Sequence, residues 1–228
     1  KQEPRKVSGF GEPETYKSKY KVVAWFKNYW YYYKIPTIAT ACVLALAVWF
    51  IVDMVTKVEQ DERFYVICDA GLLQEQYEPF REAVEPYVWD FNGDGQVVVG
   101  VSYLNLAKNP QDEVQTYAYQ QILTIFYDEA ISVMLVDDYA FSYLRQADGI
   151  AKLSDYGVTG GVDEYRVPVA GTSVEEISPT LTQMGEFYLV FRVCPEADRE
   201  KANVAANYEA MAGYVQTIAD EYQASLGE

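Results

Sequence analysis

Residues 35–52 read IPTIATACVLALAVWFIV, an apolar run of 18 residues without a charged side chain. At about 1.5 Å of rise per residue, a helix over this run spans roughly 27 Å, close to the hydrocarbon thickness of a bilayer. Pro36 lies at the start of the run, where a helix tolerates proline because the first-turn N–H has no intrahelical partner. The run is therefore predicted to be a single transmembrane helix.

The charge on the two sides of this run predicts its orientation. Residues 1–34 carry eight Lys/Arg and three Glu, whereas residues 53–228 carry ten Lys/Arg and 31 Asp/Glu, a net charge of −21. The segment WFKNYWYYYK, residues 25–34, is typical of an aromatic belt at a membrane interface. Because basic residues favour the cytoplasmic side, the N-terminus is expected in the cytoplasm, with its lysines on anionic membrane lipid.

Four segments follow from this division: a basic cytoplasmic tail with an aromatic interface segment (1–34), a transmembrane helix (35–52), a stalk (53–62) and an extracellular domain (63–228). The chain is thus expected to be a single-pass protein of the cell membrane.

Three other interpretations of the apolar run fit the sequence less well. A cleaved signal peptide needs a small-residue site after the run, but VWFIV continues the apolar stretch past Ala47. A lipoprotein would carry its lipid on Cys42, which only seven residues separate from Lys34. A core helix of a soluble protein would not explain the aromatic belt and the charge step.

The composition of the domain excludes some classes of function. A net charge of −21 repels phosphate backbones, so we expect no nucleic-acid partner; the same charge attracts cations and basic partners, or simply keeps the domain soluble. Histidine is absent, which removes the usual general base and zinc ligand. Cys68 and Cys194 lie in apolar runs and are expected to be buried thiols, with a bridge between them as the alternative.

Strand-like and helix-like segments alternate through the domain. Strands are predicted at 64–69, 96–104, 131–137, 166–169 and 186–194, and helices at 72–88, 112–130, 139–147 and 198–225. This alternation predicts an α/β domain of three layers, with a mostly parallel sheet and helices on both faces. The last helix carries one apolar stripe, from Val204 to Tyr222, which is expected to pack on the sheet; a seam for a partner helix is the alternative.

The order of these segments is similar to that in a known family of proteins. FYVICD (64–69), QVVVGVSYL (96–104), ISVMLVDD (131–138) and IAKLSDYG (150–157), with helices between them, resemble one lobe of type 2 periplasmic solute-binding proteins. The whole layout also resembles tyrosine-rich, N-terminally anchored ectodomain proteins of Gram-positive bacteria. The resemblance implies a solute-binding-like lobe on the outside of the cell.

The segment DFNGDGQ, residues 90–96, resembles the first half of a calcium loop. Asp90, Asn92 and Asp94 alternate so that their side chains converge, and Gln96 would offer a backbone carbonyl. The twelfth position lacks the bidentate glutamate, so weak binding of Ca²⁺ is predicted. The alternative is a polar turn, because Asn-Gly and Asp-Gly form turns without any metal.

Acidic residues also follow two predicted strands. Asp69 ends the first, and Asp137 and Asp138 end the third. Ligands bind at the carboxyl ends of parallel strands in open α/β sheets, so these three residues are candidate ligand-binding groups. Asp before a helix is also a common N-cap, which is the structural alternative.

The sequence contains no phosphate-binding loop, no G-x-S-x-G and no Cys–His or Ser–His pair, and an enzyme is the least favoured class. We therefore expect a membrane-tethered, non-catalytic extracellular binding or accessory module. The alternative is an accessory subunit that docks onto a larger membrane complex of the cell envelope, with an envelope protein as its partner.

Overall fold

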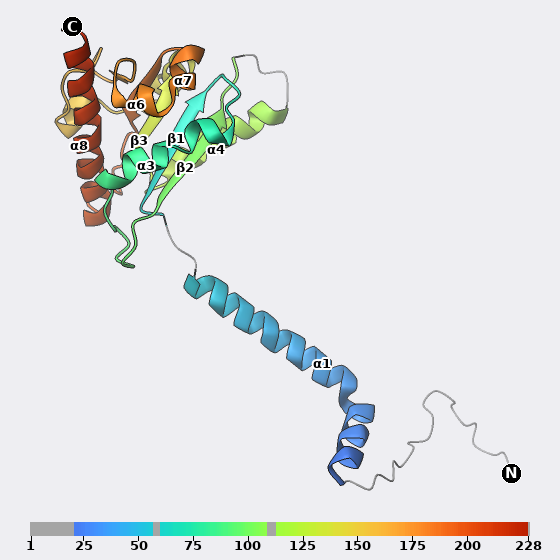
Figure 1. Ribbon diagram of the computed structural model, residues 1–228. Helices are drawn as coiled ribbons and strands as arrows, with labels where there is room; N and C mark the ends of the chain where they lie inside the picture. Colours follow the sequence, from blue (N-terminus) through green and yellow to red (C-terminus); the bar gives the residue numbers. More distant parts are fainter. Residues whose placement is uncertain (1–20, 57–59, 109–112, 228) are drawn as a thin grey trace, which may run out of the picture. The chain divides into compact units, whose positions relative to one another are not determined.

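The computed structural model describes residues 21–56, 60–108 and 113–227. The chain divides into two compact units, with the boundary between Lys57 and Val58. The first described element is one long helix, and the second unit is an α/β domain (Figure 1). The predicted tail before residue 21 lies outside the described residues.

The helix α1 runs from Lys21 to Thr56. Among the described residues it is the one helix long and apolar enough, over Trp25–Met54, to cross a membrane. It extends beyond the predicted span on both sides and includes the first residues of the predicted stalk. The remaining stalk residues 57–59 lie outside the described residues, and Glu62 already belongs to the first strand.

Pro36 lies inside α1 and not at its start, which differs from the sequence-based expectation. A proline inside a helix removes one backbone hydrogen bond and bends the axis. Figure 1 shows a change of direction in the N-terminal part of α1. The aromatic residues before Pro36 stack one turn apart, with ring centroids 5.5 Å apart for Trp25 and Tyr29 and 5.3 Å apart for Tyr29 and Tyr33.

The domain is built on a mixed sheet of five strands in the order β2-β1-β3-β5-β4. The strands are β1 (Glu62–Cys68), β2 (Val99–Asn105), β3 (Val133–Asp137), β4 (Val167–Pro168) and β5 (Phe187–Phe191). β1 is parallel to both β2 and β3, whereas β5 is antiparallel to β3 and to β4. The expectation of a mostly parallel sheet therefore holds only for the half that contains β1.

Apart from α4 (Glu113–Tyr127) and α8 (Ala202–Ser225), the helices of the domain have nine residues or fewer. They are α2 (Gln74–Tyr77), α3 (Phe80–Val84), η1 (Glu85–Tyr87), α5 (Asp138–Gln146), η2 (Leu153–Tyr156), α6 (Ser173–Ile177) and α7 (Pro179–Met184). The single helix predicted over 72–88 is wrong, because α2, α3 and η1 replace it. Pro79 and Pro86 explain the breaks, since each lacks the N–H that a continuous helix needs.

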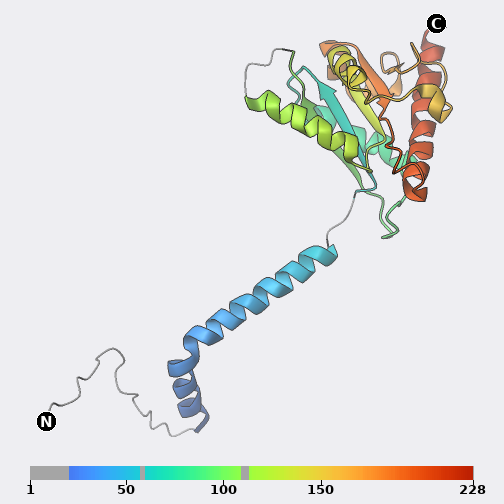
Figure 2. The ribbon, with the colours of Figure 1, turned by 180° about the vertical axis from the view of Figure 1, so that it is seen from behind.

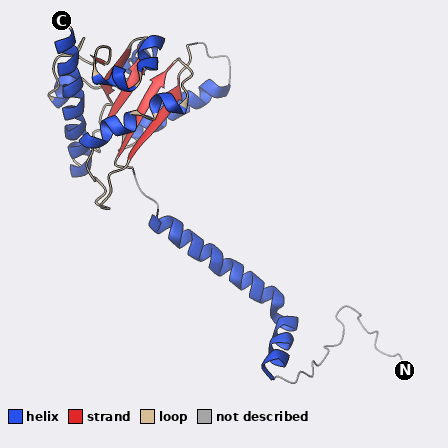
Figure 3. Cartoon of the chain, viewed as in Figure 1, coloured by secondary structure: helices blue, strands red, loops and turns tan. Residues whose placement is uncertain are grey.

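Apolar residues alternate across the sheet and form two clusters. Phe64 and Val66 of β1 belong to one cluster, which also includes side chains of α3 and α8. Ile67 of β1 and Met134 of β3 belong to the other, with side chains of α4 and α5. Figure 1 shows α3 and α8 on one side of the sheet, Figure 2 shows α4 on the opposite side, and Figure 3 shows the strands between them. Helices therefore pack on both faces of the sheet, as alternate side chains require.

The apolar stripe of α8 packs inside the domain. Val204, Tyr208, Met211, Val215 and Ile218 are buried in the first cluster. The prediction that this stripe packs on the domain's own core is confirmed. Cys68 and Cys194 are both buried free thiols, so the bridge considered for them is not formed.

Candidate functional site

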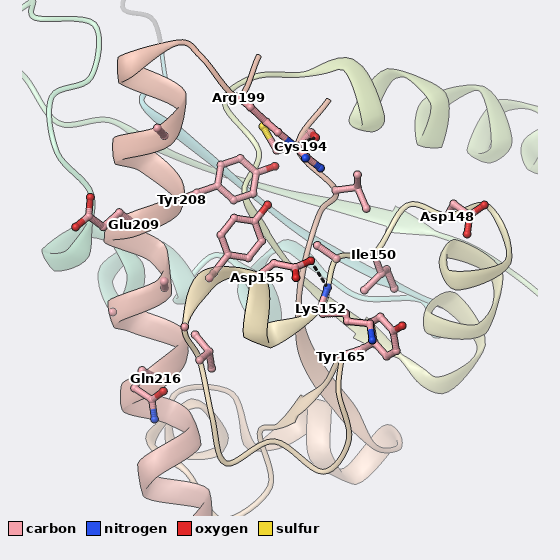
Figure 4. A pocket seen from close by; sticks show the side chains of 18 of the residues that line it. Asp148, Ile150, Lys152, Asp155, Tyr165, Cys194, Arg199, Tyr208, Glu209 and Gln216 are labelled. Atoms are coloured by element: carbon pink, nitrogen blue, oxygen red, sulfur yellow. Dashed lines mark hydrogen bonds between the residues drawn. The ribbon is translucent and has the colours of Figure 1, made fainter. Parts of the chain in front are cut away.

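A groove of about 1220 Å³ opens between η2, α8 and the chain that follows β5 (Figure 4). Ile150 forms a bridge with Arg192, which continues the sheet beyond the end of β5. This places Cys194 at one end of the groove, beside the start of α8. The polar and aromatic side chains that line it include Tyr156, Tyr165, Cys194, Arg199, Tyr208 and Gln216.

Two stacked tyrosines form one wall of the groove. The rings of Tyr156 and Tyr208 are 4.9 Å apart between centroids and inclined by 17°, and Phe191 lies 4.6 Å from Tyr156. Burial raises the pKa of Tyr156 to about 12 and raises the pKa of Tyr208 still further. Both hydroxyls therefore stay protonated at neutral pH. Tyr208 is buried and supports the partly exposed ring of Tyr156, which supplies the aromatic surface of this wall.

Arg199 and Cys194 lie together at one end of the groove, next to Tyr208 (Figure 4). Nε of Arg199 donates a hydrogen bond to the carbonyl oxygen of Cys194 over 3.2 Å. Burial raises the pKa of the Cys194 thiol, while the charges of Arg192 and Arg199 lower it. Because burial dominates, the thiol stays protonated and is not an activated nucleophile.

The opposite end carries basic residues that already have partners. Nη2 of Arg145 donates to the hydroxyl of Tyr165 over 2.7 Å, and its guanidinium carbon lies 4.1 Å from the centre of that ring. Nζ of Lys152 pairs with Glu164 over 2.7 Å. Lys152 and Tyr165 lie away from Arg199 in Figure 4. The basic side chains at this end are therefore already engaged by Tyr165 and Glu164.

Gln216 fixes the loop after η2 onto α8. Its Oε1 accepts a hydrogen bond from the N–H of Thr159 over 2.9 Å, and its Nε2 donates to Asp220 over 2.7 Å.

Two glycines shape the backbone beside the groove. Gly157 ends η2 with a φ of 74°, a left-handed conformation that favours glycine. Gly213, in the interior of α8, lines the groove, and a Cβ added there would meet no atom within 4 Å.

The predicted ligand-binding residues lie at the carboxyl ends of β1 and β3. The N–H of Asp69 donates to Oδ2 of Asp137 over 2.8 Å, so the structure brings these two together. Oδ1 of Asp137 accepts from the N–H of Ala140 and caps α5 over 2.7 Å. Asp138 points elsewhere and pairs with Arg166 over 3.0 Å. The N-cap, the structural alternative for these aspartates, is therefore realised at Asp137.

Asp69 has further partners. Its Oδ1 accepts from the N–H of Lys108 over 3.0 Å, and its Oδ2 lies 3.7 Å from Nζ of the same lysine. Both carboxylates at this edge thus connect strand ends to the segments that follow. The groove lined by Tyr156 and Tyr208 does not include them.

The predicted calcium loop is organised by its own side chains. The carboxylate of Asp90 accepts from the N–H groups of Gly93, Asp94 and Gly95 over 2.6, 3.1 and 2.6 Å. Asn92 Oδ1 accepts from Asp94 N–H over 2.8 Å, and Asp94 Oδ1 accepts from Gln96 N–H over 2.8 Å. A calcium ion would have to use the lone pairs that these bonds leave on the same oxygens.

Across residues 21–56, 60–108 and 113–227, no cluster of three or more His, Cys, Asp or Glu side chains is arranged to hold a metal ion. The calcium site at Asp90, Asn92, Asp94 and Gln96 stays a prediction, since amide and carbonyl oxygens contribute to such loops as well.

Sequence reasoning missed the groove. Tyr208 was identified only as part of the apolar stripe, and Tyr156 and Arg199 carried no signal of their own. Tyr156 and Tyr208 are 52 positions apart, and tertiary packing alone brings them together. The only hint is the tyrosine content of 21 residues, which favours binding surfaces without locating one.

Comparison of the chain with known family models, with curated proteins and with solved structures finds no match in any of the three. The fold and the groove define the class: an α/β protein with one N-terminal apolar helix, a mixed five-stranded sheet and an aromatic surface groove.

Proposed function

We propose that the chain is a membrane-tethered, non-catalytic binding module whose acidic domain lies outside the cell and binds a ligand in the groove between η2 and α8. The observation that carries this proposal is the groove itself. Its volume of about 1220 Å³ is large enough to hold a small molecule, since such sites usually measure roughly 300–1,000 Å³. Its stacked tyrosines supply the apolar surface such sites use.

The ionisable groups of the groove support binding without catalysis. The Cys194 thiol and the hydroxyls of Tyr156 and Tyr208 all have raised pKa values because they are buried. A thiol nucleophile or a phenolic base needs the opposite shift, toward the deprotonated form at neutral pH, so these three groups are not activated. Histidine, which most often supplies that base, is absent from the chain.

The tether is supported by α1 and by the charges around it. Trp25–Met54 is long enough to span the bilayer, and lysines cluster only on its N-terminal side. Helices on both faces of the sheet and the parallel strands β2-β1-β3 support the three-layer, solute-binding-like lobe that the sequence resembles. The antiparallel β5 and β4 make this lobe mixed and not mostly parallel.

Filling the groove tests the proposal. Gly213→Leu places a side chain in open space on α8, and replacing a helical glycine favours the helix, so the fold is retained. Ala224→Leu is the matched control, because Ala224 is exposed on the same helix outside the groove. Each full chain is purified gently from native membranes, and bound small molecules are identified by mass spectrometry.

A molecule retained by the wild type and by Ala224→Leu, but lost from Gly213→Leu, is the expected result. The proposal fails if Gly213→Leu retains the same molecules in the same amounts, or if the wild type retains none above a mock purification.

A second function is favoured by the outer surface of α4. Glu113 is the only charged residue in this helix of 15 residues, although the domain is strongly acidic. Tyr117, Leu123 and Tyr127 are exposed on it. Protein interfaces are depleted in charge and enriched in tyrosine, which supports the accessory subunit that docks onto an envelope complex.

A photo-crosslinking amino acid at Leu123 tests this second function in living cells. One discrete adduct at position 123, and none at the exposed Glu82 of α3, is expected for a docking face. Equal smears or no adducts at both positions would contradict it.

A further inference from the structure

The guanidinium of Arg199 is the one basic group of the groove that has no acidic partner among the described residues. Its single hydrogen bond goes from Nε to the Cys194 carbonyl oxygen, which leaves both Nη groups for other acceptors. Arg145 and Lys152, at the far end, each have a carboxylate within 4.0 Å. The nearby carboxylates of Asp198 and Glu129 already pair with Lys201, over 2.8 and 2.6 Å.

A second arginine without an ion pair among the described residues lies behind the aromatic wall. Arg192 is fully buried, and it donates from Nε to Ile131 O over 2.6 Å and from Nη1 to Phe126 O over 2.7 Å. Its Nη2 has no hydrogen-bond partner, and no carboxylate of the described residues pairs with it. Its guanidinium carbon lies 5.9 Å from the centre of the Tyr208 ring.

The charges of Arg192 and Arg199 affect the pKa values of the groups at this end of the groove. Against the larger effect of burial, Arg192 and Arg199 lower the pKa values of Tyr156 and Cys194, and Arg192 lowers that of Tyr208. Each of these shifts favours the anionic form of a group that lines the groove. Asp198 and Glu129 act in the opposite direction on Cys194, and both already pair with Lys201. Arg199 is therefore the cation at this end that is free to pair with an anion, within a domain whose net charge is strongly negative.

We propose that the groove binds a small aromatic carboxylate, with its carboxylate on the Arg199 guanidinium and its ring against Tyr156, which the buried Tyr208 supports. This inference rests on the proposed binding function and names the ligand class of the same groove. The planar fork of an arginine matches the two oxygens of a carboxylate, and the exposed part of the Tyr156 ring offers an aromatic contact to a flat apolar group. The negative charge of the rest of the domain slows the approach of anions, so selectivity depends on this local pair of cations.

Three matched probes separate charge from shape: benzoate, benzyl alcohol and benzylammonium share one ring and differ in charge. The full chain is labelled with ¹⁵N-cysteine in lipid nanodiscs, so that amide signals come from Cys42, Cys68 and Cys194. Cys194 reports on the groove, Cys68 on the distant carboxyl end of β1 and Cys42 on partition into the lipid. Cys42→Ser and Cys194→Ser assign the signals.

Benzoate is expected to shift the Cys194 signal in a saturable way at millimolar concentration, with Cys68 and Cys42 unmoved. Benzylammonium is expected to leave Cys194 unmoved, and benzyl alcohol to bind more weakly than benzoate. Arg199→Ala should weaken benzoate binding at least tenfold, and Arg199→Lys should weaken it less because the charge remains without the fork. The control Arg81→Ala, on α3 and paired with Glu78, should bind benzoate as the wild type does.

The inference is overturned if benzylammonium shifts Cys194 as strongly as benzoate, or if Arg199→Ala binds benzoate unchanged; in both cases the groove remains a binding site. If none of the three probes shifts Cys194, the groove takes no small aromatic ligand and the inference is overturned; the proposed binding function fails only if Gly213→Leu also retains the same molecules as the wild type.

Discussion

Asn207 on α8 donates a hydrogen bond from Nδ2 to Oε2 of Glu62, the first residue of β1, over 2.6 Å. The N–H and the hydroxyl of Ser132 donate to the same carboxylate, over distances of 3.0 to 3.1 Å. Glu62 is fully buried, and burial raises its pKa from 4.5 to about 7 although these hydrogen bonds lower it. A buried carboxyl thus links the last helix to the first strand.

This link predicts a dependence of stability on pH. Because the folded-state pKa of Glu62 is above its unfolded value, the folded chain holds the proton more tightly, and the contribution is complete below about pH 4.5. It is lost as pH rises from about 4.5 through about 7, by roughly 3 kcal/mol in total. Glu62→Gln, which stays neutral, should lack this loss and be more stable than the wild type at pH 8.

Chemical denaturation of both proteins at several pH values measures this difference. Parallel stability profiles for the wild type and Glu62→Gln between pH 5 and pH 8 would show that Glu62 does not titrate in this range.

The loop before β2 predicts unequal roles for its two aspartates. The Asp90 carboxylate accepts three backbone N–H groups, whereas Asp94 accepts one and is exposed. Asp90→Ala should therefore destabilise the domain by about 1–3 kcal/mol, and Asp94→Ala by about 0.5–1 kcal/mol at most. Thermal melts without calcium compare the two, and equal losses would mean that the Asp90 bonds do not hold the turn.

Calcium provides a separate test of the same loop. The sequence predicts a weak site with a dissociation constant of about 0.1–1 mM, so millimolar calcium should raise the melting temperature of the wild type by mass action. Asp94→Ala should lose that rise. Identical wild-type melts with calcium and with chelator would leave the loop as a polar turn stabilised by Asp90.

The position of Gly213 in α8 leads us to expect that replacing it stabilises the domain. It lies in the interior of α8, is exposed, and has open space where a Cβ would lie. Gly213→Ala should stabilise the domain by about 0.5–1 kcal/mol, because alanine loses less backbone entropy in a helix. Denaturant unfolding measures the change, and destabilisation would mean that the groove at Gly213 is narrower than the structure shows.

Residue patterns predicted those parts of the fold that depend on local sequence. The β-branched runs at Val66 and Val136 predicted β1 and β3, and the spacing of Val204, Met211 and Val215 predicted α8 with its buried face. Each of these elements buries a regular stripe, and such a stripe is visible in the sequence.

Strand direction and the groove were not predictable in this way. β5 is buried on both faces, so its composition is the same whether it runs parallel or antiparallel to β3. The segment between α5 and β5 is long enough to connect β3 to a strand of either direction, so its length does not predict the antiparallel one. The groove needs Tyr156, Arg199 and Tyr208 together, and no periodic pattern connects three residues on separate elements.

We expect that α1 remains attached to the mature chain and carries the domain on the outer side of a membrane. Protease is added to intact cells that produce the full chain with an N-terminal epitope, and membranes are probed for that epitope. We expect a full-length band before digestion and, after it, a membrane-bound fragment that ends near residue 57, because the lysines are expected to hold the N-terminus inside. Survival of the full-length band would contradict the outward orientation of the domain, and absence of the epitope from the untreated full-length chain would contradict the retained anchor.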